Sequence, residues 1–381
     1  MPFSFDIEKI DSGSRARAGV ITTNHGKVHT PAFCPVGTQA TVKTLSAKED
    51  VLQNTDIILN NAYHLYLRPG IDILKKMGGL HKFQSWDKAI VTDSGGFQIF
   101  SLSGLTKVNL EGARFQSPYD GSYHFISPER IVDIQSAMGS DIMMSLDECL
   151  PYPCNHADAD KSLDLTLHWE KRGIDHWREL SKSVQTGALY GIVQGGFHKD
   201  LRKRCIEELA PMDFPGYALG GLSVGEPKGL LYEMVDLCTE YLPDAQPRHL
   251  LGVGKPLDIL RCIELGIDHF DCVIPTRNAR NGSVYTWKGK FSVKAGAYKS
   301  DDRPIDTECD CFTCRNFSRG YLRHLFNAGE LLAPRLATIH SIHFYLDFMK
   351  KIRKAILDGQ FSEFARDFRA TFSDDTITPI K

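Results

Sequence analysis

The chain has 381 residues, of which 42% are hydrophobic and 24% are charged. This mix is typical of globular proteins and excludes a disordered, collagen-like or coiled-coil chain. Lys and Arg total 45 against 47 Asp and Glu, which gives a formal net charge of −2, so any nucleic acid must bind to a local basic patch. The chain shows no apolar signal segment and no apolar run long enough to cross a membrane. We therefore expect a cytoplasmic protein without a membrane span.

Short apolar segments alternate with helix-like segments along the first three quarters of the chain. The apolar segments are residues 31–36, 56–60, 88–93, 141–147, 188–194, 217–222, 248–253 and 269–274. Nearly continuous apolar segments are typical of parallel strands that are covered on both faces. These β-then-α units predict an α/β protein of the (β/α)8 TIM-barrel class, with a doubly wound open sheet as the alternative.

Several helix ends are recognisable from their residue types. Segment 46–49, Ser-Ala-Lys-Glu, has the spacing of a capping box and predicts a helix that starts there. Segment 127–139 begins Ser-Pro-Glu and ends in Gly, and segment 256–266 begins with Pro and ends in Gly. Both patterns are typical of complete helices.

The β-then-α rhythm stops near residue 300. We expect a barrel over residues 1–300, with its last helix completed further along the chain. An appended subdomain is expected over residues 301–345, followed by a C-terminal helix and tail over residues 346–381.

Polar side chains follow several of the expected strands where each strand ends. They are Asp93, Asp147, Gln194 and Asp271, and glycine-rich loops accompany them. A single Asp after a strand is often only the N-cap of the next helix. Several together, at the strand ends where barrel enzymes carry their active sites, predict a site. Paired carboxylates in one barrel mouth favour cleavage of a glycosidic bond.

Three of the ten cysteines lie close together, whereas the other seven are scattered singly. The clustered residues, within the segment ECDCFTCRN, are Cys309, Cys311 and Cys314. Three thiolates close in sequence favour zinc, which needs a fourth ligand. His324, His340 and His343 are candidates, and spacing does not choose between the last two because they would share one face of a helix. Four protein ligands would make the zinc ion structural.

A basic segment follows the last expected strand. Residues 273–300 contain no acidic residue, six Lys or Arg residues and four interleaved aromatic residues. The aromatic residues are Tyr285, Trp287, Phe291 and Tyr298. Lys and Arg neutralise phosphates and aromatic rings can stack on bases, which favours RNA binding beside Asp271. The alternative is a solvated hairpin with ordinary aromatic packing. The carboxylates and this segment together predict cleavage of the glycosidic bond of a nucleoside within RNA.

The motifs, taken in chain order, resemble those of the tRNA-guanine transglycosylases over about residues 10 to 370. They are TDSGGFQ, DECLPYP, IVQGG, GGLSVGEP, LLGVGKP, FDCVIPTRNARNG and ECDCFTCRN. The resemblance implies a (β/α)8 barrel with a C-terminal zinc-binding subdomain, one structural Zn²⁺ per chain, and a homodimer. It also implies an enzyme of queuosine biosynthesis. Such an enzyme exchanges the wobble guanine in the anticodon stem-loop of tRNA for a 7-deazaguanine base, through a covalent intermediate.

The resemblance also implies residue roles. Asp271 becomes the nucleophile at the ribose anomeric carbon, and Asp93 becomes the general acid/base. The base-binding residues are Asp93, Ser94, Gly95, Gly96, Phe97, Asp147, Gln194 and Gly221. The RNA-binding residues are Gly252, Val253, Gly254, Lys255, Pro256, Leu257, Asp258, Thr276, Arg277, Asn278, Ala279 and Arg280. The zinc ligands are Cys309, Cys311, Cys314 and His340, so the resemblance favours His340 over His343.

The expected base depends on the residues near the pocket. Val224 and Cys149 resemble the bacterial type, whose narrower pocket suits 7-aminomethyl-7-deazaguanine, whereas Ser223 stands where many bacterial members have Ala. One competing interpretation is a non-catalytic tRNA-binding homologue, which the presence of both Asp93 and Asp271 disfavours. Another is a carbohydrate-active barrel hydrolase, which the basic segment and the presence of only four Trp residues disfavour.

Overall fold

The computed structural model of the protein describes residues 3–102 and 106–376. Its centre is a barrel of eight parallel strands. They are β4 (Ala32–Pro35), β5 (Ile57–Asn61), β6 (Ala89–Asp93), β10 (Ile142–Met144), β11 (Ala188–Val193), β12 (Gly216–Leu219), β13 (Arg248–Leu250) and β14 (His269–Cys272). Their order is β4-β14-β13-β12-β11-β10-β6-β5, and a parallel bridge between Val36 and Leu59 joins the two ends. All eight predicted strands and the (β/α)8 class are confirmed, and the open doubly wound sheet is wrong.

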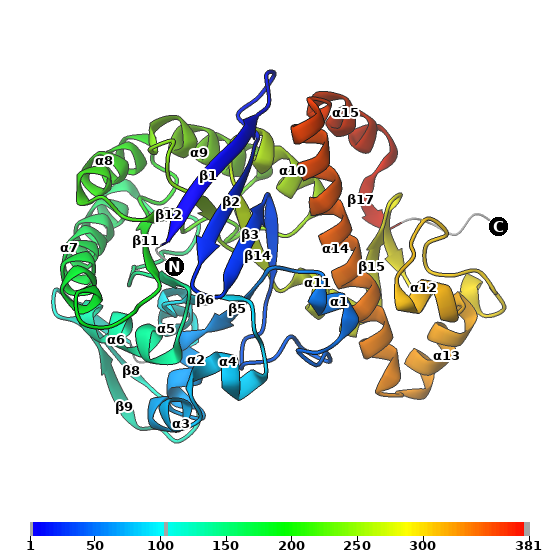
Figure 1. The fold of residues 1–381 in the computed structure, drawn as a ribbon, viewed down its shortest axis with the longest axis horizontal. Helices are drawn as coiled ribbons and strands as arrows, with labels where there is room; N and C mark the ends of the chain where they lie inside the picture. Colours follow the sequence, from blue (N-terminus) through cyan, green and yellow to red (C-terminus); the bar gives the residue numbers. More distant parts are fainter. Residues whose placement is uncertain (1–2, 103–105, 377–381) are drawn as a thin grey trace.

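Helices surround the barrel (Figure 1). Those that follow the strands include α2 (Ala62–Leu67), α3 (Ile71–Lys76), α4 (Gly79–Gln84), α5 (Gly96–Leu102), α6 (Pro128–Met138), α7 (His156–Ser181), α8 (Lys199–Leu209), α9 (Lys228–Tyr241) and α10 (Pro256–Glu264). The predicted ends of two are confirmed. The Ser127 hydroxyl accepts from the Arg130 amide at the start of α6, and Gly139 ends that helix with φ 76°. Gly266 follows α10 with φ 97°.

The capping box predicted at residues 46–49 is wrong. The short helix there, α1 (Asp50–Gln53), begins after this segment, with Glu49 at its N-cap. The Ser46 hydroxyl accepts from the amide of Lys48, and the Glu49 carboxylate binds Arg335 at 2.9 Å. A tertiary ion pair therefore takes the carboxylate that a capping box would have used.

The barrel interior is apolar over most of its depth. Alternate residues of the strands point inward, because side chains alternate across a strand, and Cys34, Leu59, Val91 and Tyr190 are among those buried there. An antiparallel sheet of β1 (Ser4–Ile10), β2 (Arg17–Thr23) and β3 (Gly26–Thr30) lies across the barrel (Figure 1). Its side chains pack into the same cluster at the N-terminal ends of the barrel strands. The C-terminal ends carry the polar residues predicted for the site.

A second antiparallel sheet lies beside the barrel. It consists of β7 (Lys107–Asn109), β8 (Gly112–Gln116) and β9 (Tyr123–Ile126), which precede α6. Ala113 and Phe115 of β8 are buried against the same core cluster as Ile131 of α6. This insertion therefore packs onto the outer helices.

The C-terminal region is attached to the barrel by one long helix, α14 (Leu332–Asp358), which packs on β4 as well as on α11, α12 and α13 (Figure 1). The region comprises α11 (Ile274–Arg280), β15 (Ser283–Thr286), β16 (Gly289–Ser292), α12 (Phe312–Asn316), α13 (Arg319–Ala328), α15 (Phe361–Thr371) and β17 (Ser373–Thr376). Since α14 serves both parts, the division into residues 1–300, 301–345 and 346–381 stays a prediction. Within the described ranges, no helix is both long and apolar enough to cross a membrane.

Candidate functional site

Asp93 lies at the C-terminal end of β6, directly opposite Asn61 of β5 in the strand register. The Asn61 amide donates to Asp93 Oδ2 at 2.6 Å, and the backbone amide of Ala62 donates to Oδ1 at 3.3 Å. Among the described residues no cation pairs with this carboxylate. Burial raises the pKa of Asp93 to about 8, and the negative charge of Asp271 adds to the increase. The group can therefore hold a proton at neutral pH.

Asp147 and Gln194 form the second part of the site. The Gln194 side-chain amide donates to Asp147 Oδ2 at 2.6 Å. Burial raises the pKa of Asp147 to about 6, although the hydrogen bond from Gln194 opposes this increase. A Cβ at Gly96 would lie 2.3 Å from Asp147 Oδ1, and one at Gly221 would lie 2.4 Å from Gln194 Oε1. The loops after β6, β10, β11 and β12 therefore converge, and glycine is needed where they meet.

The segment after Asp93 is shaped by its neighbours. Ser94 is buried, and Gly95 has φ 83° with Tyr63 where a Cβ would be. Phe97, at the start of α5, is 53% exposed. A large apolar ring with this exposure beside polar groups is available for contact with a flat ligand.

Asp271 lies on β14, and its side chain is 14% exposed. The Nε2 atom of His249 lies 2.9 Å from Asp271 Oδ1, and the Gly252 amide lies 3.4 Å from the same oxygen. Asp93 and Asp271 lie at the C-terminal ends of β6 and β14, at the same end of the barrel, and the charge of Asp271 contributes to the raised pKa of Asp93. The structure thus brings together Asp93, Asp147, Gln194 and Asp271, as the strand ends predicted.

Two buried charged residues that support the site were not predicted from the sequence. Arg202 of α8 is fully buried and donates to the carbonyls of Gly196 and Gly220, at 2.7 and 2.9 Å. This guanidinium therefore holds two glycine loops of the site in place. Glu170 of α7 is likewise buried and accepts from Ser145 at 2.6 Å. Both lie within helical segments whose patterns do not distinguish a buried charge from an exposed one.

The predicted RNA-binding residues fall into three groups, which are exposed, half-buried and buried. Gly252, Lys255 and Arg277 are exposed, whereas Leu257, Asn278 and Arg280 are half-buried. The buried members are Val253, Gly254, Pro256, Asp258, Thr276 and Ala279. Asp258 accepts from the Tyr232 hydroxyl at 2.6 Å and pairs with Lys228 at 2.8 Å. A direct contact with RNA is thus open to the first two groups, while the buried residues shape the loop.

The aromatic residues of the basic segment are not available to stack on bases. Tyr285, Phe291 and Tyr298 are buried, and Trp287 packs against the main core. The Phe291 and Tyr298 rings stack on each other with centroids 4.6 Å apart. The stacking role expected from the sequence is therefore wrong, because the β15–β16 hairpin uses these rings to pack on α14 and α13.

A Cys3His cluster joins α12 to α14. The Nδ1 atom of His340 lies 3.6, 3.6 and 3.3 Å from the sulfur atoms of Cys309, Cys311 and Cys314. Two ligands bound tetrahedrally at about 2.3 and 2.0 Å from one ion would be about 3.5 Å apart, so the spacing fits a metal ion. The Tyr285 carbonyl accepts from His340 Nε2 at 2.9 Å, which leaves Nδ1 free to face the thiols.

The alternative ligand His343 lies outside this cluster. Its Nε2 atom pairs with Asp310 at 2.9 Å. The cluster that could hold a metal ion consists of Cys309, Cys311, Cys314 and His340. Of the alternatives open in the sequence, the geometry therefore favours His340.

A second cluster lies at the opposite end of the barrel. His25 Nδ1 lies 2.8 Å from Asp141 Oδ1, and the Ile90 amide donates to Asp141 Oδ2 at 2.9 Å. His81 Nε2 lies 2.9 Å from the Lys88 carbonyl, so this nitrogen must donate a proton. Burial would raise the pKa of Asp141, but the hydrogen bonds from His81, His25 and Ile90 outweigh it and lower the pKa below its usual value.

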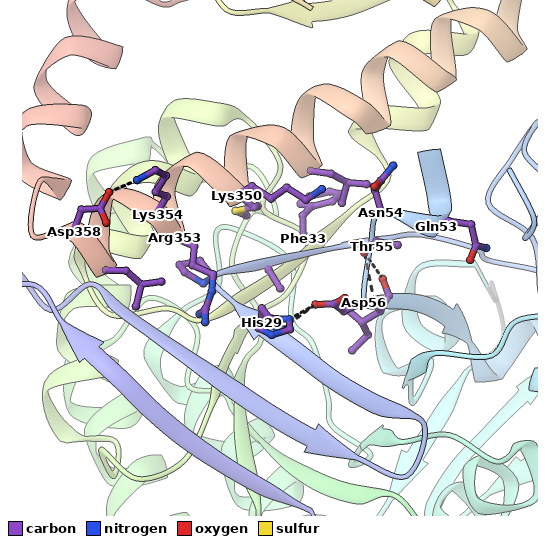
Figure 2. Close-up of a pocket in the computed structure, with 16 residues that line it drawn as sticks. His29, Phe33, Gln53, Asn54, Thr55, Asp56, Lys350, Arg353, Lys354 and Asp358 are labelled. Atoms are coloured by element: carbon purple, nitrogen blue, oxygen red, sulfur yellow. Dashed lines mark hydrogen bonds and ion pairs between the residues drawn. The ribbon is translucent and has the colours of Figure 1, made fainter. Parts of the chain in front are cut away.

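A surface hollow of about 520 Å³ lies between α14 and the loop before β5 (Figure 2). His29 pairs there with Asp56 at 2.8 Å, and Lys354 pairs with Asp358. Arg353 donates to the Thr30 carbonyl. None of the predicted site residues lines this hollow, and its charged groups mostly bind one another.

The fold and these side chains define a (β/α)8-barrel enzyme with carboxylates at the C-terminal ends of its strands and a separate Cys3His cluster. The family model described as queuine tRNA-ribosyltransferase matches residues 11–374. A queuine tRNA-ribosyltransferase of Thermoanaerobacter pseudethanolicus is 54% identical over 364 residues, which cover 96% of each chain. One from Thermodesulfovibrio yellowstonii is 52% identical over 353 residues, 93% of this chain and 91% of the relative. One from Nitratidesulfovibrio vulgaris is 49% identical over 376 residues, 99% of each. The chain belongs to the queuine tRNA-ribosyltransferase family, a family of pentosyltransferases.

Proposed function

We propose that the protein is a tRNA-guanine transglycosylase of queuosine biosynthesis. It exchanges the wobble guanine of the tRNA anticodon stem-loop for a 7-deazaguanine base. The observation that carries this proposal is that Asp93 and Asp271 lie together at the C-terminal end of the barrel, where neither has a Lys or Arg partner among the described residues. Two carboxylates with different surroundings can divide the chemistry at an anomeric carbon between them.

In the first half-reaction Asp271 acts as the nucleophile. A carboxylate oxygen forms a bond to C1′ of the ribose while the bond from C1′ to N9 of guanine breaks, with its electron pair moving to the base. The proton that the departing base needs comes from Asp93, whose raised pKa keeps the group protonated near neutral pH. The product is a tRNA chain linked through its ribose to Asp271.

In the second half-reaction the incoming base replaces guanine. Its N9 attacks C1′, the ester bond to Asp271 breaks, and Asp93, now a carboxylate, takes the N9 proton. Both carboxyl groups return to their starting states. Water has no role in this sequence, because the second base resolves the covalent intermediate.

The base is held by the groups that converge beside Asp93. Asp147, Gln194 and the backbone of Gly221 would hydrogen-bond the edge of the purine-like ring, with Phe97 against its face. The 2.6 Å hydrogen bond between Gln194 and Asp147 supports this role, because it fixes both side chains before a base binds. We expect 7-aminomethyl-7-deazaguanine to be preferred, since Val224 would occupy the space that a cyclopentenediol substituent requires.

The tRNA would lie over the loop after β13 and over α11. Lys255 and Arg277 are exposed there, and Arg280 is half-buried. Burial lowers the pKa of Arg280, which remains a cation at neutral pH. These side chains can neutralise phosphates beside the cleft. Because tRNA is the substrate, we expect the protein to act in the cytoplasm.

The Cys3His cluster would bind one structural Zn²⁺. Three soft thiols and one imidazole suit zinc better than magnesium or calcium. With Cys309, Cys311, Cys314 and His340 as ligands, no coordination position would remain for substrate. The ion would cross-link α12 to α14 and thereby hold the C-terminal region beside the barrel.

We also expect a homodimer. Exposed apolar side chains of the C-terminal region support an interface there, among them Phe312, Tyr321 and Leu331, which are 49%, 40% and 86% exposed. Sedimentation equilibrium at micromolar concentration tests this expectation, and a mass of one chain would contradict it.

The direct test of function is exchange of radiolabelled guanine into unmodified tRNA. We expect incorporation at the wobble position, and none into tRNA whose wobble base is not guanine. A non-catalytic homologue would bind tRNA without incorporating label. A hydrolase would release guanine without incorporating any.

A further inference from the structure

A row of three side chains extends from Asp271 into the barrel interior. His249 of β13 lies 2.9 Å from Asp271 through its Nε2 atom, and 2.9 Å from His269 between the two Nδ1 atoms. Both imidazoles are fully buried. Residues 269 and 271 point to the same side of β14, because side chains alternate along a strand.

The positions of the protons in this row follow from its contacts. A carboxylate oxygen can only accept, so His249 Nε2 carries a hydrogen and donates to Asp271 Oδ1. Burial lowers the pKa of His269 far below its usual value, with the neighbouring His249 as a second cause, so His269 is neutral. The two facing Nδ1 atoms need one hydrogen between them.

Two assignments of that hydrogen are possible, and the surroundings favour one. If His269 Nδ1–H donates, His249 is neutral and His269 Nε2 is a bare acceptor, which agrees with its having no partner among the described residues. If His249 Nδ1–H donates, His249 becomes a fully buried cation and His269 Nε2–H becomes a buried donor without an acceptor. Both features of the second assignment are costly.

We infer that His249 and His269 are positioning residues that prepare Asp271 for nucleophilic attack. His269 fixes the tautomer of His249, and His249 holds Oδ1 of Asp271 together with the Gly252 amide. This leaves Oδ2 directed to the anomeric carbon. The inference rests on the proposed function, since it assumes that Asp271 attacks a ribose.

A neutral partner suits this role better than a cation does. An Arg or Lys at position 249 would stabilise the negative charge of Asp271 strongly and so make the carboxylate a weaker nucleophile. A neutral imidazole orients the carboxylate at a smaller electrostatic cost. The His269 contact keeps the required tautomer without adding charge.

The test compares His249→Leu, His249→Gln and His269→Leu with the wild-type protein. The measurement is the single-turnover rate at which the covalent tRNA adduct forms, together with the tRNA dissociation constant and the melting temperature. A Gln side chain can place an amide N–H near the position of imidazole Nε2, whereas Leu cannot donate. His81→Gln, at the other end of the barrel, is the control for a histidine outside the cleft.

We expect His249→Leu to form the adduct about 100-fold more slowly, since misplacing a reacting group by about 1 Å costs this much. We expect His249→Gln to recover most of the rate, His269→Leu to lose about 10-fold, and tRNA affinity to stay within about twofold in each variant. A Gln variant no faster than the Leu variant, or a Leu variant as fast as wild type, would overturn the inference. If His249→Leu does not fold, the His249→Gln and His269→Leu rates decide, and a wild-type rate in His269→Leu overturns it. Absence of adduct and exchange in the wild-type protein would instead overturn the proposed function.

Discussion

The two ends of the barrel each hold two histidines and an aspartate, but they use these residues in opposite ways. At the N-terminal end, Asp141 is fully buried and accepts from the Ile90 amide and from two histidines. At the C-terminal end, the donors found in residues 3–102 and 106–376 reach one oxygen of Asp271 only, and this side chain is partly exposed. The aspartate is thus enclosed by donors at one end of the barrel and partly exposed at the other.

The carboxyl groups show the same difference in their pKa values. Donors surround Asp141 and lower its pKa, whereas burial and a neighbouring carboxylate raise the pKa of Asp93. The first group stabilises the fold as an anion. The second is held in a state that costs stability, which is typical of groups that serve chemistry. The two clusters contain similar residue types, so the difference between a structural and an active cluster lies in how many hydrogen-bond donors each carboxylate has.

The largest effect should come from removing the nucleophile. Asp271→Asn should reduce guanine exchange by a factor of about 10⁴ or more, because the amide cannot form the covalent intermediate. Asp141→Asn, assayed well below its melting temperature, should retain exchange within a few-fold. The radiolabel exchange assay measures both. Comparable losses in the two variants would remove the distinction between the two ends of the barrel.

The Cys3His cluster is a third polar cluster to compare with these two. Its side chains bring their metal-ligand atoms close to one another. Cys311→Ser should lower both the zinc content and the thermal stability. Structural zinc contributes on the order of 10 kcal/mol of binding free energy in small zinc domains, so a loss of several kcal/mol is expected here. Metal analysis and calorimetry on the same sample provide the test. A folded variant that retains one zinc ion per chain would disprove this ligand assignment.

Stability should respond to pH with opposite signs at the two ends. Because the folded pKa of Asp93 is about 8, its contribution is fully present below pH 3.8 and is lost as the pH rises toward 8. Asp93→Asn should therefore stabilise the protein by about 1–3 kcal/mol at pH 8 and by less at pH 5. The lowered pKa of Asp141 gives a contribution that is present above pH 3.8 and lost at lower pH, so Asp141→Asn should destabilise the protein at pH 8.

Denaturant unfolding at pH 5 and pH 8 measures how the Asp93 contribution changes with pH, and unfolding at about pH 3 shows the loss of the Asp141 contribution. Because the wild-type protein and the variants share all other titrating groups, the differences between them isolate the two carboxyls. A destabilised Asp93→Asn variant at pH 8 would contradict the account of this group.

The smallest effect concerns base selectivity within the cleft. Val224→Gly should increase the efficiency with queuine relative to 7-aminomethyl-7-deazaguanine by about 10- to 100-fold, since the removed side chain frees space for a few carbon atoms. Steady-state kinetics with the two bases measure the ratio. If the wild-type protein already uses both bases equally well, Val224 is not the residue that selects.

The barrel could be predicted because each strand is locally visible as an apolar segment. The ends of α6 and α10 were also visible, since Pro128 and Pro256 mark their first turns. The capping box at residues 46–49 failed because Arg335, far away in the chain, binds the carboxylate on which it depends. Long-range ion pairs leave no local pattern in a sequence.

The candidate site was predictable for a related reason. Polar residues at strand ends meet wherever parallel strands form a barrel, so the convergence of Asp93 with Asp271 follows from the topology. The row through His249 and His269 needs the register of neighbouring strands, which short apolar segments do not specify. The base-stacking role predicted for the aromatic residues near Tyr285 was wrong because residue type alone does not say whether a ring is buried. Their partners come from α14, about 60 residues further along the chain.

The central claim is that Asp271 becomes covalently attached to tRNA while Asp93 moves the proton. The most direct measurement is a denaturing gel of protein and tRNA in the presence of a base analogue that stalls the second half-reaction. The account predicts a tRNA-linked band with the wild-type protein and none with Asp271→Asn, although this variant should still bind tRNA under native conditions. A band that persists in Asp271→Asn but disappears in Asp93→Asn would contradict the account and reverse the two roles.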